Sequence, residues 1–235
     1  MKVLLWDIDG TLLRTGTAGN AAWCDAVAAE SGREVSLDGF TTAGFTDLDI
    51  AHRLAAEHFS ASPGVAERLL VCYLERLPGR LVPGCGRVLP NVREILGTAG
   101  GRPGLECALL TGNVERGGRA KLAHFGLADL FAWGAFADGT RDRDEVARRA
   151  LWEARSRHRD GLEALLVIGD TPRDVACARA IGAPCLAVAT GDFSRAELAA
   201  TDPWRTLESL PTPPAFFAAL ERAPAWKAPA QLPAS

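Results

Sequence analysis

The sequence predicts an α/β fold in which a parallel sheet is covered by helices on both faces. Four short apolar runs, Val3–Ile8, Leu105–Thr111, Leu165–Gly169 and Cys185–Ala189, show no alternation between polar and apolar residues. Such runs are typical of strands that are buried on both faces. Helical stretches separate the runs, and strands that alternate with helices form parallel sheets. Phe131–Phe136 is a weaker candidate for a further strand.

A helical insertion separates the first predicted strand from the second. No buried-strand run occurs between Arg14 and Arg87, and three patterns with helical spacing stand there instead. Their apolar positions are Trp23 and Val27, then Ile50 and Leu54, and finally Val65, Leu69, Tyr73 and Leu77. We therefore expect two domains, a core of residues 1–13 and 88–222 and a helical domain of residues 14–87.

The connections between the two domains and the end of the chain have their own composition. We expect hinges at Leu13–Thr17 and at Leu81–Arg87, and Pro78-Gly79 and Pro83-Gly84 mark the approach to the second. The last 13 residues, Ala223–Ser235, contain five Ala and three Pro. This composition predicts a flexible tail or a loose surface strap.

The composition excludes several classes of protein. The chain of 235 residues has a net charge of −3, which argues against nucleic acid or an acidic membrane as the main partner. Its first apolar run is too short for a signal peptide, and no stretch approaches about 18 apolar residues. The six cysteines form no Cys-x-x-Cys pair and no zinc-like spacing, so we expect reduced thiols. These features predict a cytoplasmic protein, either a monomer or a homodimer.

Lysine is rare in this chain. Of 26 basic residues, 23 are Arg, and only Lys2, Lys121 and Lys227 are Lys. The simplest cause is a GC-rich genome. Lys121 is the only Lys far from both termini, on a stretch, Val114–Phe125, that we expect to be helical. Taken alone, a cation on a helix most often faces solvent.

A pair of carboxylates follows the first predicted strand, in the motif Asp7-Ile8-Asp9-Gly10-Thr11. A turn in which Asp side chains bond their own backbone is one interpretation of this motif. A calcium loop is excluded, because that loop needs Gly at its sixth position and an acid at its twelfth. Open parallel sheets bind their ligands at the carboxyl ends of strands, so this pair is a candidate site.

Two more strand ends carry polar residues. Thr111, Gly112 and Asn113 follow the second long run, and a hydroxyl beside exposed backbone N–H groups suits a phosphate oxygen. Asp170 ends the third run, and Thr171-Pro172 is a good helix start. Asp174 then falls in the first helical turn, where a carboxylate stabilises the helix as a cap.

In this order along the chain, the motifs Asp-x-Asp-Gly-Thr, Thr-Gly, a single Lys and Gly-Asp-x-x-x-Asp resemble those of the haloacid dehalogenase-like hydrolase superfamily. The resemblance covers about Met1 to Arg222. Gly44-Phe45-Thr46-Asp47 and Pro90-Asn91-Val92 are similar to the phosphoglycolate phosphatase-like branch. The resemblance implies a Rossmann-like core, and the helical insertion looks like the cap domain of this superfamily.

The resemblance also implies roles for the residues at the strand ends. Asp7 would be the nucleophile that forms an aspartyl-phosphate, and Asp9 the general acid and base. Mg²⁺ would be bound by Asp7, by the backbone carbonyl of Asp9 and by Asp170, all of them hard oxygen ligands. Asp174 would hold a metal-bound water or orient the cation. Further groups would bind the transferring phosphate: Thr111, Gly112, Asn113 and Lys121.

Two cations remain candidates for neutralising the phosphate. Many relatives carry a Lys in a Lys-Pro-x-Pro stretch after the third strand, whereas this chain has residues 138–143 there, without any Lys. In the interpretation that we favour, Lys121 reaches the site from the helix that follows Thr111. In the other, Arg143 takes the place of the missing Lys. In the insertion, Phe45, Asp47 and Arg53 are candidates for substrate contact, with ordinary packing as the alternative.

The function predicted from the sequence is a Mg²⁺-dependent phosphatase that acts on small phosphorylated metabolites, for example phosphoglycolate. A sugar phosphomutase is the main alternative, because it also needs two Asp in the first motif. A dehalogenase would not need Asp9 or Asp170, and a non-catalytic phosphate sensor would lack one of the three carboxylates. A dinucleotide-binding protein is disfavoured, because Gly84-Cys85-Gly86 follows Pro83 and not a strand.

Overall fold

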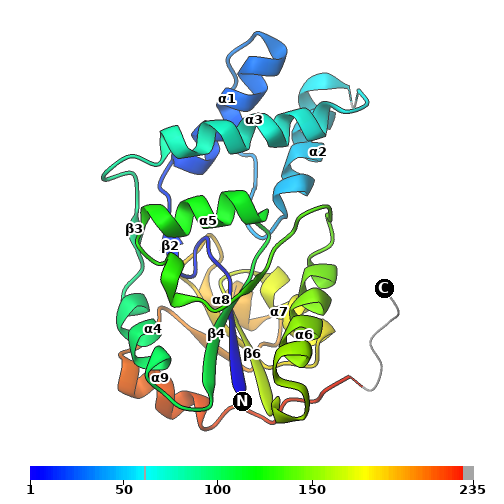
Figure 1. Ribbon diagram of the computed structural model, residues 1–235. Coiled ribbons are helices and arrows are strands. Elements are labelled where there is room, and N and C mark those ends of the chain that lie inside the picture. The colour runs from blue at the N-terminus through cyan, green and yellow to red at the C-terminus, as the bar shows by residue number, and fades with distance from the viewer. Residues whose placement is uncertain (61, 230–235) are drawn as a thin grey trace.

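A sheet covered by helices makes up the larger part of the molecule, and three further helices lie above the carboxyl edge of the sheet (Figure 1). The structure is a computed structural model that describes residues 1–60 and 62–229. Among these residues, no helix is both long enough and apolar enough to cross a membrane.

The sheet has six strands in the order β5-β4-β1-β6-β7-β8, and all neighbours are parallel. The strands are β1 (Lys2–Trp6), β4 (Leu105–Leu110), β5 (Gly134–Ala135), β6 (Ala164–Gly169), β7 (Cys185–Val188) and β8 (Arg205–Leu207). Leu4 of β1 pairs with Cys107 of β4 and with Leu166 of β6. The predicted α/β fold with a parallel sheet is therefore confirmed.

Successive residues of β1 enter two separate cores because side chains alternate across a strand. Val3 and Leu5 pack on one face of the sheet, and Leu4 and Trp6 on the other. The first face is covered by α6 (Arg143–His158), α7 (Pro172–Ala180) and α8 (Arg195–Ala199). The second face is covered by α4 (Val92–Gly100), α5 (Glu115–His124) and α9 (Pro213–Leu220). Two 3-10 turns, Ala128–Leu130 and Arg159–Gly161, complete the core.

The insertion consists of the three predicted helices, α1 (Ala18–Ser31), α2 (Asp47–Phe59) and α3 (Val65–Arg80). They bury a core of their own, which contains all four residues of the predicted stripe on α3. Inside it, the rings of Trp23 and Tyr73 stack at a centroid distance of 4.0 Å and an angle of 4°. The insertion thus has an independent apolar centre and meets the core through α5.

The two connections to the insertion pair with each other. The short strands β2 (Leu13–Arg14) and β3 (Arg87–Val88) are antiparallel and overlap the expected hinge segments. The sequence gives no sign of this ribbon, because each strand has only two residues. Likewise β8, with one exposed and two half-buried residues, lacks the apolar run that revealed the other strands.

The chain after α9 lies against the core as far as the structure describes it. Trp226 Nε1 donates to the Ile181 carbonyl at 3.0 Å, and the Lys227 N–H donates to the Gly182 carbonyl at 3.2 Å. Arg155 Nη2 reaches the Pro229 carbonyl at 3.1 Å. Residues 223–229 of the expected tail thus form a strap, and residues 230–235 lie outside the described residues.

Candidate active site

The carboxyl ends of β1, β4 and β6 border a cavity of about 280 Å³ between the sheet and the insertion. Core loops contribute Asp7, Gly112 and Asp170 to its lining, and the insertion contributes Trp23 and Tyr73. The loops at this edge converge because parallel strands all end there. The strand-end motifs of the sequence therefore share one cavity.

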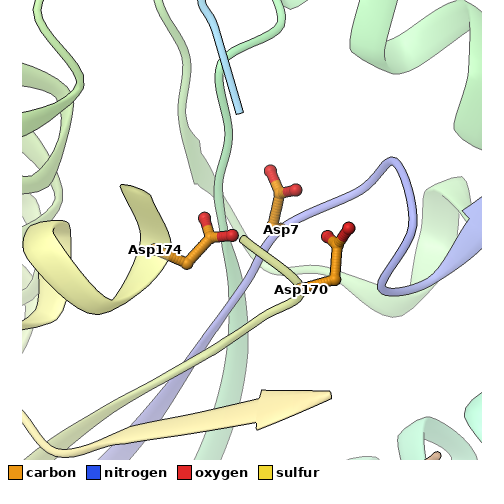
Figure 2. A group of neighbouring side chains, drawn as sticks. All are labelled: Asp7, Asp170 and Asp174. Atoms are coloured by element: carbon orange, nitrogen blue, oxygen red, sulfur yellow. The ribbon is translucent and has the colours of Figure 1, made fainter. Parts of the chain in front are cut away.

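Three buried carboxylates form an acidic cluster at the sheet edge of this cavity. Asp7 follows β1, Asp170 follows β6 and Asp174 lies in the first turn of α7 (Figure 2). One oxygen from each lies within 4.8 Å of the others. Thr11 Oγ1 donates to Asp170 at 2.9 Å. At Gly10, whose φ is +83°, an added Cβ would collide with the Asp170 carboxylate, so only glycine fits this turn.

The acidic cluster carries more negative charge than its surroundings easily tolerate. Burial and the neighbouring Asp174 raise the pKa of Asp7 to about 7, against the opposing effect of Arg143. Burial, with Asp174 and Asp7 nearby, raises the pKa of Asp170 well above its usual range. Converging carboxylate oxygens of this kind match the ligands that hard divalent cations such as Mg²⁺ prefer. The residues present therefore fit a divalent metal ion.

Asp174 is held in place by its own helix. Thr171 donates to Asp174 Oδ2 through its N–H at 3.0 Å and its hydroxyl at 2.7 Å, and Thr171 Oγ1 accepts from the Asp174 N–H at 3.3 Å. This reciprocal capping box confirms the helix start predicted at Thr171-Pro172. Arg143 binds the other oxygen of Asp174 and lies 3.5 Å from Asp7 Oδ1. The Asp174 carboxylate is thus bound by the helix cap Thr171 on one oxygen and by Arg143 on the other.

A second polar group, made of Asp9, Asn113 and Lys121, lines the same cavity. Lys121 Nζ donates to Asp9 Oδ2 at 2.6 Å and to Asn113 Oδ1 at 2.6 Å, and Asn113 Nδ2 donates to Asp9 Oδ2 at 2.8 Å. Burial disfavours the ammonium, but the charges of Asp9 and other acidic neighbours outweigh this and raise the pKa of Lys121. The side chain of Asp9 is 40% exposed and therefore open to the cavity.

The loop after β4 presents the residues that the sequence assigns to phosphate. Thr111 is fully buried, and its hydroxyl oxygen accepts from Asn113 Nδ2 at 2.9 Å. An added Cβ at Gly112 would lie 2.5 Å from the Phe45 carbonyl and 3.1 Å from Arg143 Nη1. The insertion therefore packs directly against this loop, and only a residue without a side chain fits at Gly112.

Asp47 joins the insertion to this loop. Its N–H donates to the Gly112 carbonyl at 2.8 Å, and its carboxylate accepts from the Val114 N–H at 2.9 Å. Burial raises the pKa of Asp47 to about 6, with Lys121 acting in the opposite direction. Of the candidates in the insertion, Phe45 and Asp47 line the cavity, whereas Arg53 lies over the Phe45 ring at 4.0 Å.

Comparison with known proteins places these features in a family. A model described as haloacid dehalogenase-like hydrolase matches residues 4–179, which include every residue of the two polar groups. The chain belongs to the haloacid dehalogenase-like hydrolases. A second model, of the same hydrolase-like kind, matches residues 144–224.

Individual relatives of this hydrolase include a phosphatase and two solved structures. The chain is 28% identical over 197 residues to a phosphoglycolate phosphatase of Mesorhizobium japonicum, covering 82% of this chain and 85% of that protein. A predicted phosphoglycolate phosphatase from Haemophilus somnus has a similar fold, with a TM-score of 0.73 at 16% identity over 94% of this chain and 97% of that one. The protein CbbY from Rhodobacter sphaeroides, solved in complex with phosphate, has a TM-score of 0.69 at 19% identity. The match covers 88% of this chain and 93% of CbbY. This hydrolase thus shares its fold with both solved structures.

Both candidate cations of this hydrolase line the cavity, each with different partners. Lys121 contacts Asp9 and Asn113, whereas Arg143 contacts Asp174 and Asp7. The side chain of each is 6% exposed. Both cations line the cavity, because Lys121 lies in the last turn of α5 and Arg143 is the first residue of α6. The assignment of the phosphate-neutralising role to Lys121 stays a prediction.

Arg14 and Tyr73 are among the cavity residues that sequence reasoning missed. Arg14 of β2 lines it and donates to the carbonyls of Thr190 at 2.8 Å and Gly191 at 2.6 Å. Tyr73 lines it too, although the spacing on α3 indicates only a core position. The position of Arg14 three residues after the first motif is a signal for its place at the site, whereas nothing in the sequence distinguishes Tyr73 from its apolar neighbours.

Proposed function

We propose that this hydrolase removes phosphate from a small phosphorylated metabolite with Mg²⁺ as its cofactor. The observation that carries the proposal is the meeting of two groups in one cavity. One is the acidic cluster of Asp7, Asp170 and Asp174, and the other joins Lys121 to Asp9 and Asn113. The first suits a divalent cation and a nucleophile, and the second suits a phosphate and a proton donor.

Asp7 is the nucleophile in this proposal. Its carboxylate oxygen forms a bond to phosphorus while the bond from phosphorus to the leaving oxygen breaks, which gives an aspartyl-phosphate. Asp9 gives a proton to the leaving oxygen, so that the product leaves as an alcohol. Asp9 then takes a proton from the water that attacks phosphorus, and the release of inorganic phosphate restores Asp7. The side chain of Asp9 is partly exposed to the cavity, which suits proton exchange with the substrate and with water.

Asp7, Asp170 and the backbone carbonyl of Asp9 are the proposed ligands of Mg²⁺, and Asp174 holds a water or orients the group. When bound, Mg²⁺ supplies positive charge that lets an anionic carboxylate approach an anionic phosphate. The raised pKa values of Asp7 and Asp170 support this assignment, because they show a cluster that a cation would stabilise.

The phosphate itself is assigned to the loop after β4 and to Lys121. The hydroxyl of Thr111 and the N–H of Gly112 are donors that suit the transferring oxygens, and Asn113 orients Asp9 and Thr111 beside them. Lys121 neutralises the charge that remains. Arg143 keeps Asp174 and Asp7 in position through its ion pairs with both. Phosphate monoesters react so slowly alone that such positioning and charge account for nearly all of the catalysis.

The helical insertion acts as a cap in this proposal. It covers the cavity, and Trp23, Phe45, Ile50 and Tyr73 give the part away from the sheet an apolar and aromatic lining. A cap of this kind excludes water and selects the leaving group. The volume of about 280 Å³ favours a small metabolite over a macromolecule.

A panel of metabolite phosphates tests the function. We expect release of inorganic phosphate from small monoesters in the presence of Mg²⁺, loss of turnover with EDTA and recovery when Mg²⁺ is added back. Turnover that is indifferent to the chelator would contradict the metal assignment. Isomerisation of a sugar phosphate without phosphate release would identify a phosphomutase instead.

A further inference from the structure

Arg14 of β2 is a cation that lines the cavity together with Lys121 and Arg143. Lys121 is paired with Asp9, and Arg143 is paired with Asp174. In the described part of the chain, the Arg14 guanidinium donates only to two backbone carbonyls, and no carboxylate oxygen lies within 4.0 Å of it. Unlike the other two cations, Arg14 therefore carries a charge that no carboxylate of these residues neutralises directly.

The two carbonyls hold the Arg14 guanidinium by one edge. Nε donates to the Thr190 carbonyl at 2.8 Å, and Nη2 donates to the Gly191 carbonyl at 2.6 Å. A guanidinium has five N–H donors in a planar fork. Its other edge, formed by Nη1 and the second N–H of Nη2, has no acceptor among residues 1–60 and 62–229. Two parallel N–H donors of this kind match the two oxygens of a carboxylate or phosphate group.

The loop that holds Arg14 lies directly beside the acidic cluster. Thr190 Oγ1 donates to the Gly10 carbonyl at 2.6 Å, which ties this loop to the turn after Asp9. An added Cβ at Gly191 would collide with the Asp170 carboxylate. Gly191 alone thus separates the guanidinium from a proposed metal ligand. A small ligand with one anionic group at the acidic cluster can therefore reach Arg14 with a second group a few atoms away.

The lining next to Arg14 does not compete for its charge. The chain continues along the cavity with four uncharged residues, Thr15, Gly16, Gly19 and Asn20. Asp192 lines the cavity too, but it is exposed, so water screens its carboxylate. This part of the cavity therefore offers an anion one fixed cation beside small, neutral neighbours.

We propose that Arg14 is a specificity-determining residue that binds a second acidic group of the substrate, a carboxylate or a phosphate on the leaving part. The inference rests on the proposed phosphatase function and narrows its substrates to metabolites with two acidic groups. Lys121 binds the transferring phosphate, and Arg14 binds the other acidic group through the edge formed by Nη1 and Nη2. A neutral leaving group gains nothing from this edge, so it binds more weakly.

Matched pairs of phosphate monoesters test this preference in wild type and in Arg14→Met, which removes the charge but keeps a long side chain. The acidic members are phosphoglycolate, 3-(phosphonooxy)propanoate and ethane-1,2-diol bisphosphate. Their neutral counterparts are the two amides and 2-hydroxyethyl phosphate. The carboxylates and the bisphosphate distinguish the two kinds of acidic group.

For wild type, we expect at least one acidic ester to exceed its neutral counterpart about tenfold or more in kcat/KM, mainly through a lower KM. In Arg14→Met, this preference should fall below twofold. The absence of any preference in wild type, or a preference that survives in Arg14→Met, would overturn the proposal.

Thr190→Val is the control for a purely structural role of Arg14. It removes the hydroxyl that donates to the Gly10 carbonyl and loosens the same loop, but it leaves the guanidinium in place. We expect kcat/KM to change by the same factor for both members of each pair, so the preference stays within twofold of wild type. Loss of the preference in Thr190→Val, to the same extent as in Arg14→Met, would show that the loop selects the substrate and would overturn the proposal.

Calorimetric titration with phosphonates tests the site without hydrolysis. Phosphonoacetate and 3-phosphonopropionate carry a carboxylate and no ester bond, and their amides are the neutral counterparts. At matched free Mg²⁺, at least one acid should bind wild type about tenfold or more tightly than its amide, and Arg14→Met should reduce the difference below twofold. Equal binding of acid and amide by wild type would overturn the inference. The expected difference in a protein that hydrolyses no phosphate monoester would instead contradict the proposed function alone.

Discussion

At the scale of single residues, the two buried cations of the cavity differ in what they hold together. Lys121 pairs with Asp9, whose side chain is 40% exposed, so this carboxylate keeps contact with the cavity if the lysine is lost. Arg143 pairs with Asp174 and Asp7, whose side chains are 0% and 6% exposed. Removing Arg143 therefore leaves buried charge without a partner, which costs much more stability than removing Lys121.

Alanine variants of the two cations should separate catalysis from folding. We expect Lys121→Ala to lower kcat at least about 100-fold with a small change in Tm, because it removes charge stabilisation of the transferring phosphate. Arg143→Ala should lower the free energy of unfolding by about 3–5 kcal/mol. Thermal unfolding and steady-state kinetics on the folded fraction make the comparison. A larger loss of kcat in Arg143→Ala would move the phosphate-neutralising role to Arg143.

The carboxyl of Asp47 should make stability depend on pH. Its pKa is raised from 3.8 to about 6, so the folded state binds this proton more tightly than the unfolded state. The resulting stabilisation is complete below pH 3.8 and is lost as the pH rises through about 6. Asp47→Asn cannot ionise and keeps an oxygen that accepts from the Val114 N–H.

The free energy of unfolding of Asp47→Asn, relative to wild type, should therefore increase by about 2 kcal/mol between pH 4 and pH 7. Urea unfolding at several pH values measures this difference. Asp38→Asn, which removes an exposed carboxyl from the insertion, is the control and should show no comparable trend. A difference that stays constant across this range would contradict the burial argument.

At the scale of elements, the first turn of α7 ties helix stability to the acidic cluster. The Thr171 side chain accepts from the Asp174 N–H and donates to its carboxylate, so one residue caps the helix and fixes a carboxylate of the acidic cluster. Loss of an N-cap costs about 1 kcal/mol. The same loss frees the Asp174 carboxylate to turn away from Asp170 and Asp7.

Thr171→Ala should thus lower the free energy of unfolding by about 1 kcal/mol and also weaken Mg²⁺ binding. Calorimetric titration of Mg²⁺ together with thermal unfolding gives both values. Thr171→Ser keeps a capping hydroxyl and should restore both. Unchanged Mg²⁺ affinity in the alanine variant would show that Asp174 does not depend on its cap for its position.

The elements that the sequence predicts best are the long buried ones. Apolar runs identify β1, β4, β6 and β7, and helical spacing identifies all three helices of the insertion. The ribbon of β2 and β3 and the strand β8 escape prediction, because they are too short and too exposed to carry a pattern. Boundaries shift for a related reason: β1 ends at Trp6, since Asp7 and Ile8 already belong to the turn toward Gly10.

At the scale of the whole molecule, the topology brings the strand-end residues together. Asp7, Thr111 and Asp170 each follow a strand, and because β4, β1 and β6 are parallel neighbours, their carboxyl ends meet at one cavity. The sequence predicts this meeting of the three strand ends. Contacts across the insertion do not, because Tyr73 and Arg14 reach the cavity only through the packing of α3 on α5 and the pairing of β2 with β3.

The most direct test of the account is hydrolysis of an aryl phosphate by Asp7→Asn in the presence of Mg²⁺. The Asn amide is nearly isosteric with the Asp7 carboxylate. Because the pKa of the buried Asp7 carboxyl is raised, its ionisation costs stability, so the variant should fold with an undiminished Tm at neutral pH. We expect kcat at least about 1,000-fold below wild type, because the oxygen that attacks phosphorus has lost its charge. A folded Asp7→Asn variant that retains kcat within about tenfold of wild type would contradict covalent catalysis by Asp7.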